Sequence, residues 1–588
     1  GEIYISAPSI SLTGGAQLSA STHSSGSGGN ISLIASESVE LSGAVTEIPK
    51  AIFYTQQTGL ARIPPGTFLG GFIPTGKVPL VPLDNGYYGD PQFPEGTLFP
   101  SGVFTQTTQG SAGSAGNISI ETGRLIIKQG AAIATTTFGQ NSNAGNISVQ
   151  ALDSISLDNG SIKSGVAGEA RGNSGNITVN TNTLSAVNGG QLLTSTSGDG
   201  QAGDIIVNAQ QIQLSGFNSG LFAQTSSAAN AGNLTLQTLG EGQTLTVNFL
   251  DGAQISASTL SSGRGGNLTI TAPESITLTG NGSLISAETS GSGTGGDLTL
   301  QTGTLTVRDG AKVTVSGAQT GNAGNMEIIA NSVLLDNGGK LIAETASGEG
   351  GNIKLQVRDL LLMRRNSLIS TSAGTASAGG NGGNITISAP FVVAVPIENS
   401  DIRANAYTGT GGRVDITASG IFGLQLSQED TPLSDITASS QYGVQGTVTL
   451  NTPNVDPSRG LTNLPTEVID ASNQIAQNCR PGSTAASKQS SFVITGRGGL
   501  PLNPTEALSS DNIQVDWVSL TPTEDNPSTT EVSNHPTSAT PAPLVEAQGW
   551  VMNEKGQVVL TATAPTVTPH SSWHTPMNCD APPSTPIF

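Results

Sequence analysis

The chain has 588 residues, of which 11% are charged and 4% are aromatic, and it contains 77 glycines. Ordinary soluble domains carry roughly 25% charged residues and about 7% glycine, so this composition argues against a helical bundle or a row of common globular domains. The formal net charge is −20, and no lysine- or arginine-rich run occurs. Nucleic acid is therefore excluded as a partner, because its phosphates would be repelled.

A repeat fills residues 1–450. Each copy has a small-residue run that ends in glycine, then an asparagine or aspartate, and then an alternating strand. The asparagines at this corner are Asn117, Asn146, Asn176, Asn233, Asn267, Asn325, Asn352 and Asn384, and Asp204 and Asp297 take their place in two copies. Nine intervals separate Asn117 from Asn384, a mean period of about 30 residues, and such a period indicates a solenoid.

Each repeat contains three short segments in which apolar and polar residues alternate. In the copy after Asn146, the apolar positions are Ile147 and Val149, then Ile155 and Leu157, then Ile162. Alternation with period two predicts strands with one inward face, which a single unit cannot bury until successive units stack. The sequence therefore predicts an all-β fold, a parallel β-helix with three strands per turn. Its right-handed sense is expected from the general preference of parallel crossovers.

The glycine–asparagine corners have a structural interpretation. Both residue types tolerate the left-handed backbone conformation, so a sharp corner at a fixed place in every turn would select them. Stacked asparagine side chains are then expected to hydrogen-bond along the column as a ladder. We interpret the eight corner asparagines as this structural ladder and not as a binding site.

One turn is interrupted by an insertion at about residues 47–101, which is rich in proline, glycine and aromatic residues. Insertions in a solenoid lie at its corners, so the segment is predicted to form a loop lobe on the side of the rod. Exposed aromatic rings on such a lobe suit sugar or protein surfaces. The candidate binding residues are Tyr54, Phe72, Tyr87 and Tyr88. The alternative is an insertion that only packs on the rod.

The regular period ends after Leu450. Residues 451–520 are irregular and proline-rich and are predicted to cap the β-helix, and residues 521–548 have the proline, threonine and serine content of a linker. Residues 549–588 are predicted to form a small β-hairpin and a tail. The two cysteines, Cys479 and Cys579, form no metal motif and are a disulfide candidate, with two free thiols as the open alternative.

Several segments carry a resemblance to a known family. The repeats, of which Gly-Asn-Ile-Thr-Val at 175–179 is typical, are followed by Ile-Asp-Ala-Ser at 469–472, the Cys479 segment, Gly-Arg-Gly-Gly-Leu-Pro at 496–501 and Val-Asp-Trp at 515–517. Together they resemble the C-terminal portion of cyanobacterial filamentous-haemagglutinin-like exoproteins, which are passengers of two-partner secretion. The resemblance implies an outer-membrane β-barrel transporter as a partner, folding outside the cell and a secreted or cell-surface location. The family's signal peptide and secretion domain are not seen before Gly1, so a fragment is one interpretation of the chain.

An enzyme acting on polysaccharide is the serious alternative for a parallel β-helix. Glycosidic cleavage needs two carboxylates at a set separation or a base beside a bound metal. In the regular turns the acidic residues are sparse and fall mostly at corners, as Asp158, Asp251, Asp309 and Asp336 do, and no histidine lies between His23 and His535. No catalytic residue, cofactor or metal site is predicted. We therefore expect a non-enzymatic, adhesin-like rod for display and binding, with a glycan or cell-surface ligand.

A third possibility concerns hydroxyl groups on the outer face of the third strand, as in Thr194–Ser197 and Ser370–Ser372. Stacked turns would give a flat hydroxyl-rich face for glycans or ice. The simpler interpretation is that an exposed sheet prefers polar β-forming residues.

Overall fold

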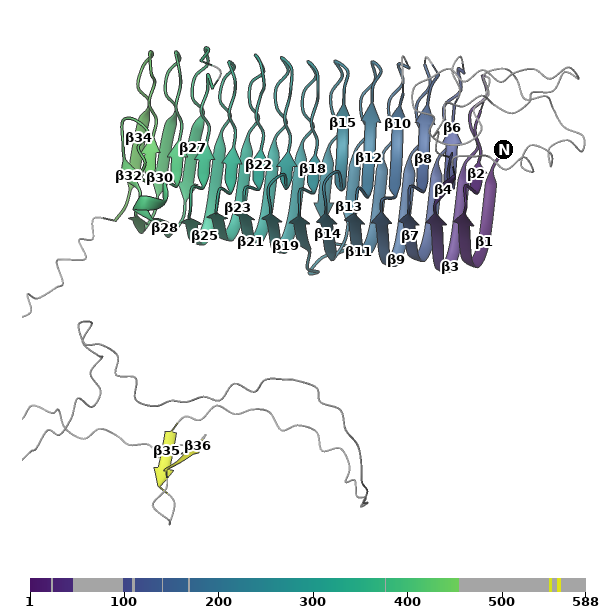
Figure 1. The fold of residues 1–588 in the computed structure, drawn as a ribbon, viewed down its shortest axis with the longest axis horizontal. Helices are drawn as coiled ribbons and strands as arrows, with labels where there is room; N and C mark the ends of the chain where they lie inside the picture. Colours follow the sequence, from purple (N-terminus) through teal and green to yellow (C-terminus); the bar gives the residue numbers. More distant parts are fainter. Residues whose placement is uncertain are drawn as a thin grey trace, which may run out of the picture. The chain divides into compact units, whose positions relative to one another are not determined.

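The computed structural model describes residues 1–22, 25–45, 99–107, 111–139, 141–167, 170–375 and 377–453, together with two short strands at 549–552 and 558–561. The chain divides into two units, Gly1–Val455 and Asp456–Phe588. The first unit is a solenoid in which successive turns stack their strands in parallel (Figure 1). The predicted all-β parallel β-helix is therefore confirmed.

One wall of the solenoid is an 18-stranded sheet, which we call the long-strand sheet. In most turns the first two predicted segments are joined in one bent strand of 11 or 12 residues. These strands are β1 (Ile3–Thr13), β3 (Ile31–Ser42), β7 (Ile118–Lys128), β9 (Ile147–Asp158), β11 (Ile177–Val187), β19 (Leu268–Thr279), β21 (Leu298–Arg308), β23 (Met326–Asp336) and β25 (Ile353–Met363).

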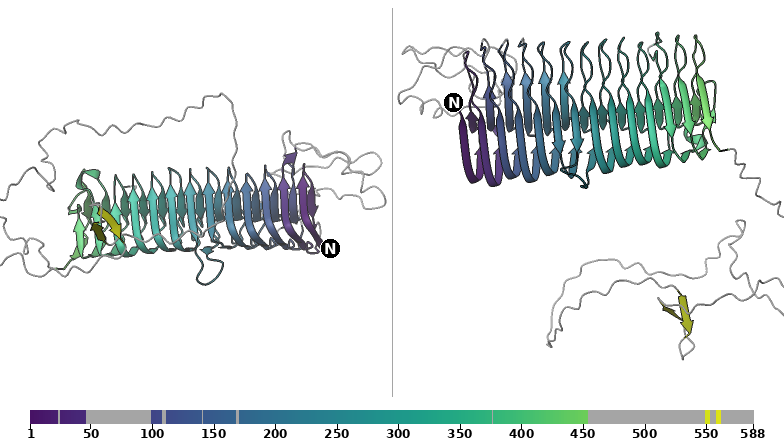
Figure 2. Two further views of the ribbon diagram at one scale, coloured as in Figure 1. Left: turned by 90° about the horizontal axis from the view of Figure 1, so that it is seen from below. Right: turned by 180° about the vertical axis from the view of Figure 1, so that it is seen from behind.

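In the remaining turns of this sheet the two segments are separate strands. They are β13 (Ile205–Asn208) with β14 (Gln211–Ser215), β16 (Leu234–Gln237) with β17 (Thr246–Leu250), β27 (Asn384–Ser388) with β28 (Phe391–Ala394), β30 (Arg413–Thr417) with β31 (Gly420–Phe422), and the last strand β34 (Thr447–Asn451). The loop between β16 and β17 protrudes from the solenoid (Figure 2).

The third segment of each turn forms a 14-stranded sheet, which we call the short-strand sheet. Its strands are β2 (Gln17–Ser19), β6 (Gly102–Gln106), β8 (Ala132–Thr137), β10 (Ser161–Val166), β12 (Gln191–Thr196), β15 (Gly220–Thr225), β18 (Gln254–Ser256), β20 (Leu284–Ser286), β22 (Lys312–Thr314), β24 (Lys340–Ile342), β26 (Leu368–Ser370), β29 (Asp401–Arg403), β33 (Asp435–Thr437) and β32 (Gln425–Leu426). A single 3-10 turn, η1 (Pro396–Glu398), precedes β29.

The core is one continuous aliphatic column that runs between the two sheets from Ile10 to Ala438. In β21, for example, Leu298, Leu300, Leu305 and Val307 are at most 1% exposed, and the neighbouring Thr299, Gln301, Thr304 and Thr306 are half-buried or exposed. The parallel register repeats this alternation at each turn, since Leu298 pairs with Leu268 on one side and Met326 on the other. The period-two pattern therefore fixes which side chains enter the column.

The predicted insertion leaves the solenoid between two short strands that pair with each other. Residues Ala44–Val45 form β4, which is antiparallel to β5 (Phe99–Pro100), so the described ends of the segment meet at its base. Strand β6 then resumes the short-strand sheet between β2 and β8. Residues 46–98 lie outside the described residues, and with them the candidates Tyr54, Phe72, Tyr87 and Tyr88.

The second unit contains β35 (Gly549–Met552) and β36 (Val558–Thr561), an antiparallel pair at the position of the predicted hairpin. The predicted cap beyond residue 453, the linker 521–548 and both cysteines, Cys479 and Cys579, lie outside the described residues. No helix among the described residues is long and apolar enough to cross a membrane.

Candidate functional site

The corner asparagines form a continuous ladder on the surface of the solenoid. In most steps the Oδ1 atom of one asparagine accepts the backbone N–H of the equivalent residue in the next turn, as Asn117 does from Asn146 (2.8 Å) and Asn146 from Asn176 (2.8 Å). At Asn325 the donor is the side-chain amide of Asn352 (2.8 Å). The column continues through Asn233, Asn267, Asn325, Asn352 and Asn384. Asp204 keeps the pattern, because its carboxylate accepts the N–H of Asn233 at 2.7 Å. The ladder therefore needs an acceptor at this position more than it needs an amide.

The expected reason for the glycine–asparagine corner is wrong in one respect. None of the eight ladder asparagines has a positive φ; left-handed residues such as Asn159 and Asn188 lie instead in the turn that leads to the short-strand sheet. The glycine before each ladder residue is required by close approach. A Cβ on Gly145 would lie 1.9 Å from the carbonyl oxygen of Gly116 in the preceding turn. The corner is thus selected by the spacing between turns and not by its backbone conformation.

Many of the hydroxyl groups of the third strand point into the fold and not to solvent. Thr194, Thr196 and Ser370 are at most 2% exposed. The Thr194 hydroxyl donates to the carbonyl of Gly203 at 2.5 Å inside the turn. On the outer side, Ser258 and Ser286 are hydrogen-bonded to each other at 2.8 Å, and both are nearly buried. These hydroxyls satisfy polar groups of the fold, whereas Ser195 and Ser372 are half-buried and Ser197 is exposed, so only some of the hydroxyls in these segments face solvent.

A concave feature lies on the outer side of the long-strand sheet, where its strands bend. Over β19, β21, β23, β25 and β27 this bend encloses a groove of about 600 Å³, which we call the bend groove. Its lining residues are Thr271, Pro273, Gln301, Thr302, Gly303, Ile329, Ala330, Asn331, Lys354, Leu355, Gln356, Val357, Arg358, Thr386 and Ser388. The lining therefore combines hydroxyl, amide and aliphatic groups with the cations of Lys354 and Arg358 along five turns.

The bend itself is a series of β-bulges. In the ladder between β23 and β25, Ala330 pairs with Val357 and Ser332 with Leu360, so Arg358 and Asp359 oppose Asn331 alone. A bulge of this kind bends the strand and changes the direction of a side chain. Gly303 faces the equivalent bulge of β19, where a Cβ would lie 2.6 Å from the carbonyl oxygen of Pro273. The glycine therefore lets the backbone come close at the floor of the groove.

A second groove occupies the same bend at the other end of the solenoid. It has a volume of about 520 Å³ and crosses β1, β3, β7 and β9, and its lining includes Glu121 and Gln150 but no lysine or arginine. We call it the N-terminal groove. Between the two grooves Asn180, Asn208 and Gln237 occupy the same column; the Asn208 amide donates to Asn180 at 2.6 Å, and the Gln237 amide donates to Asn208 at 2.8 Å. The bend therefore carries amide side chains between its two hollows.

The short-strand sheet has a hollow of its own, with a volume of about 410 Å³. Glu288 and Glu344 line it together with Lys312 and Lys340. Glu288 accepts the hydroxyl of Thr314 at 2.7 Å and lies 3.4 Å from Lys312, and Glu344 accepts the hydroxyl of Ser370. Sequence reasoning missed these carboxylates because it placed most acidic residues at corners. Glu288 and Glu344 stand at equivalent positions two repeats apart, and this spacing in the sequence could have indicated them.

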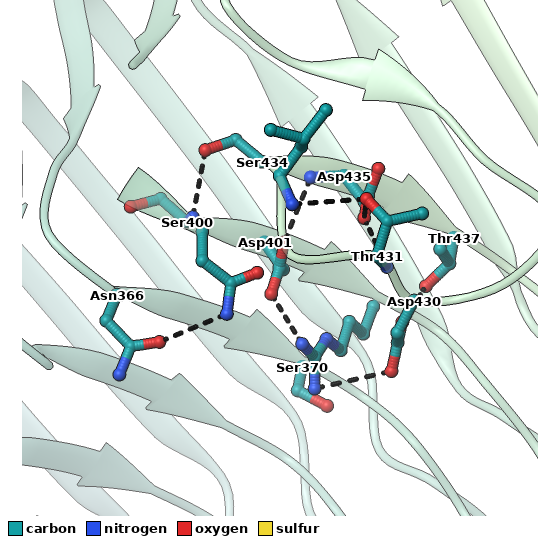
Figure 3. A network of polar contacts seen from close by, with 12 residues as sticks. Asn366, Ser370, Ser400, Asp401, Asp430, Thr431, Ser434, Asp435 and Thr437 are labelled. Carbon is teal, nitrogen blue, oxygen red and sulfur yellow. Dashed lines mark hydrogen bonds and ion pairs between the residues drawn. The ribbon is translucent and has the colours of Figure 1, made fainter. Parts of the chain in front are cut away.

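The last turns contain a buried ionic network (Figure 3). Asp401 and Asp435 are 2% and 0% exposed. The carboxylate of Asp401 accepts a hydrogen bond from the Arg403 guanidinium at 2.5 Å and another from the backbone N–H of Asp435 at 2.9 Å. Arg403 also approaches Asp430 at 3.4 Å. The carboxylate of Asp435 accepts hydrogen bonds from Gln425, Ser427 and Thr431. The network holds the segment 425–435 against the end of the short-strand sheet.

The two buried carboxylates respond differently to this environment. Burial raises the pKa of Asp401 above its usual value, against the opposing effect of its hydrogen bond from Asp435 and of Arg403. Burial also tends to raise the pKa of Asp435, but the hydrogen bonds from Ser427, Thr431 and Gln425 together lower it. Both carboxylate oxygens of Asp435 thus accept hydrogen bonds from neighbouring residues of the fold, and we assign the network a structural role.

Within the part of the chain that the structure describes, no three His, Cys, Asp or Glu side chains come together as a possible metal site. The candidate site that the geometry offers is therefore the bend groove, with the short-strand hollow as a second. Comparison with protein-family models, with curated proteins and with solved structures finds no match to this chain.

Proposed function

We propose that this protein is a non-enzymatic, adhesin-like rod that binds a glycan chain along the bend groove. The observation that carries the proposal is the groove itself, which five successive turns build from amide, hydroxyl and aliphatic side chains. A glycan offers hydroxyl edges and apolar ring faces in alternation, so such a lining complements it. The strands beneath are held in a parallel ladder, and a preformed site loses little conformational freedom on binding.

The surroundings of this activity are also proposals. The resemblance to filamentous-haemagglutinin-like exoproteins supports a secreted or cell-surface location and a β-barrel transporter as the export partner. The described fold agrees with a chain that is displayed as a rod, because each turn contacts only its neighbours and can be added in sequence. The lobe residues Tyr54, Phe72, Tyr87 and Tyr88 stay a prediction for a second contact surface.

One observation favours the alternative of an enzyme acting on polysaccharide. Thr289 pairs with Gly317 and Gly317 with Thr345, so Glu288 and Glu344 occupy equivalent positions two turns apart. Neighbouring strands lie a little under 5 Å apart, so the backbones of two residues at equivalent positions two turns apart are separated by about 10 Å. Inverting glycosidases hold their carboxyl groups roughly 6.5–9.5 Å apart. Both glutamates are engaged by neighbouring hydroxyls, which is why we place this function second.

Two assays on the full chain separate these functions. In the first, a panel of immobilised polysaccharides is tested with the wild-type protein and with Gln301→Ala/Gln356→Ala, which removes two amides from the bend groove. Our proposal expects saturable binding that the double variant weakens.

The second assay measures reducing ends released from the same polysaccharides. The adhesin proposal expects no release. Release that is abolished by Glu288→Gln and by Glu344→Gln would replace it with the enzyme.

A further inference from the structure

We propose that the bend groove selects polysaccharides that carry carboxylate groups, with Arg358 as the residue that recognises the charge. This inference rests on the proposed function and names the class of ligand for that site. It follows from the lining of the groove, whose only charged residues are Lys354 and Arg358.

The lining of the bend groove presents two cations on a strongly negative protein. The chain has a formal net charge of −20. The lining of the bend groove nevertheless contains Lys354 and Arg358 and no aspartate or glutamate. A cleft of one sign concentrates ligands of the opposite sign, because the field of its side chains is focused there. An anionic chain is therefore favoured over a neutral one at this place on the rod.

Arg358 is available to a ligand. Its side chain is 73% exposed, and its neighbour Asp359, 53% exposed, approaches it at 3.4 Å. Exposed pairs of this kind contribute little, about 0–1 kcal/mol, so a ligand can displace Asp359 at small cost. The bulge places Arg358 opposite Asn331 at the groove. A guanidinium group binds a carboxylate through two parallel hydrogen bonds, which gives it geometric selectivity.

Lys354 is less available. Its ammonium group lies 2.9 Å from the carboxylate of Glu327 in the preceding turn. We therefore expect Lys354 to add a smaller contribution, and the amides of Gln301 and Gln356 to bind hydroxyls of the same chain. In register order, Gln301 pairs with Ile329 and Ile329 with Gln356, so the two amides lie two turns apart on one column.

The N-terminal groove provides a comparison within the same molecule. It follows the same bend over β1 to β9 but has Glu121 in its lining and no cation. It is expected to repel a carboxylate-bearing chain. The charge difference between the two grooves, and not their shape alone, would then decide where such a ligand binds.

The test is a binding titration of the full chain with polygalacturonate, dextran sulfate and neutral dextran at low and high salt. The variants are Arg358→Gln and the matched control Arg171→Gln. Arg171 is 71% exposed and lies 3.4 Å from Asp199, so it reproduces the exposure and pairing of Arg358 outside the groove. Each variant removes one positive charge, and unfolding midpoints confirm that both are folded.

We expect polygalacturonate to bind, Arg358→Gln to weaken it about tenfold, as the loss of a charge-assisted hydrogen bond would, and Arg171→Gln to leave it unchanged. Added salt should weaken binding as well. Equal loss in both variants would overturn the inference by showing only nonspecific attraction. Binding of dextran sulfate in preference to polygalacturonate would overturn the carboxylate selectivity.

The outcomes also separate this inference from the proposed function. If dextran binds and Gln301→Ala/Gln356→Ala weakens it while Arg358→Gln does not, the groove is a neutral glycan site and only the inference fails. If none of the polysaccharides binds, the proposed function fails with it.

Discussion

At the scale of single residues, the repeat is maintained by two different requirements at one corner. The glycine keeps the backbone of one turn close to the next, as at Gly383, where a Cβ would lie 1.8 Å from the carbonyl oxygen of Gly351. The residue after the glycine must accept a hydrogen bond, as the side-chain oxygen of Asn352 does from the backbone N–H of Asn384. Each requirement predicts a distinct response to substitution.

Substituting the corner glycine is expected to destabilise the solenoid. Gly383→Ala forces apart two backbone segments, and overpacking of this kind costs about 1–3 kcal/mol. Gly379→Ala is the control, because the nearest atom to its Cβ would be the Thr408 hydroxyl at 3.9 Å. Chemical denaturation should show a lower midpoint for Gly383→Ala only. Equal midpoints would show that the turns can separate without cost.

Substituting a ladder residue is expected to depend on whether an acceptor remains. Asn146→Ala leaves the N–H of Asn176 without its partner and should cost about 1 kcal/mol. Asn146→Asp keeps an oxygen in place, as Asp204 does naturally toward Asn233, and should cost less. Denaturation midpoints give the order of the two variants. The reverse order would mean that the amide group is what the ladder needs.

At the scale of elements, ion pairs join the last turns of the solenoid. Arg364 donates to both carboxylate oxygens of Glu398 in η1, at 2.6 and 2.8 Å. Hydrogen bonding from Arg364 lowers the pKa of Glu398 to about 2, with a contribution from the N–H of Arg365. The contact connects β25 to the turn that precedes β29, so it reports on the docking of that turn.

This pair predicts a pH dependence of stability with a definite sign. A carboxylate whose pKa is lower in the folded chain stabilises it above the unfolded value of 4.5, and the contribution is lost as the pH falls toward about 2. The advantage of the wild type over Glu398→Gln should therefore shrink between pH 5 and about pH 2. Denaturation of both proteins across this range measures it. A difference that stays constant with pH would contradict the assigned cause.

The strands also show which parts of the fold could be predicted from the sequence. Alternation of apolar residues correctly predicted the inward positions Ile147, Val149, Ile155, Leu157 and Ile162, all of which are buried. The same pattern could not show the bend between the first two segments, because bulges such as Arg358–Asp359 change register without interrupting polarity. The bend groove depends on that bend, so the sequence alone could not reveal it.

Other differences have the same origin in the stacking of turns. Hydroxyls such as Thr194 were expected to face solvent, but they satisfy carbonyls of the corner glycines. Asp401 and Arg403 lie together in β29, and Asp435 occupies the position equivalent to Asp401 in the next turn, so only the stacking of β33 on β29 joins the three charges. Contacts between successive turns are long-range in sequence, so local composition does not specify them.

At the scale of the described solenoid, Gly1–Val455, each turn contacts the turns beside it, and stability is expected to add turn by turn. Deleting residues 297–324 would join Gly296 to Asn325 and remove one complete repeat with β21 and β22. The corner would be rejoined in register, so we expect a folded rod that is shorter by about 4.8 Å. Deletion of residues 297–310 would remove half a repeat and place polar residues in the core.

Circular dichroism and small-angle scattering of these two deletions, made in the full chain, test that additivity. The full-repeat deletion should keep its β-sheet signal and unfold cooperatively, and the half-repeat deletion should lose both properties. Comparable behaviour of the two would contradict a fold that is built from interchangeable turns.

The measurement that tests the central claim most directly fills the bend groove and leaves the rest of the rod unchanged. Gln301→Trp/Gln356→Trp places two large side chains on outward positions of β21 and β25, and Gln150→Trp is the control at the equivalent column outside the groove. Binding to the polysaccharide panel is compared at matched unfolding midpoints. Our account predicts that the double variant loses binding and that the control retains it. Undiminished binding by the filled groove would show that the glycan site lies elsewhere.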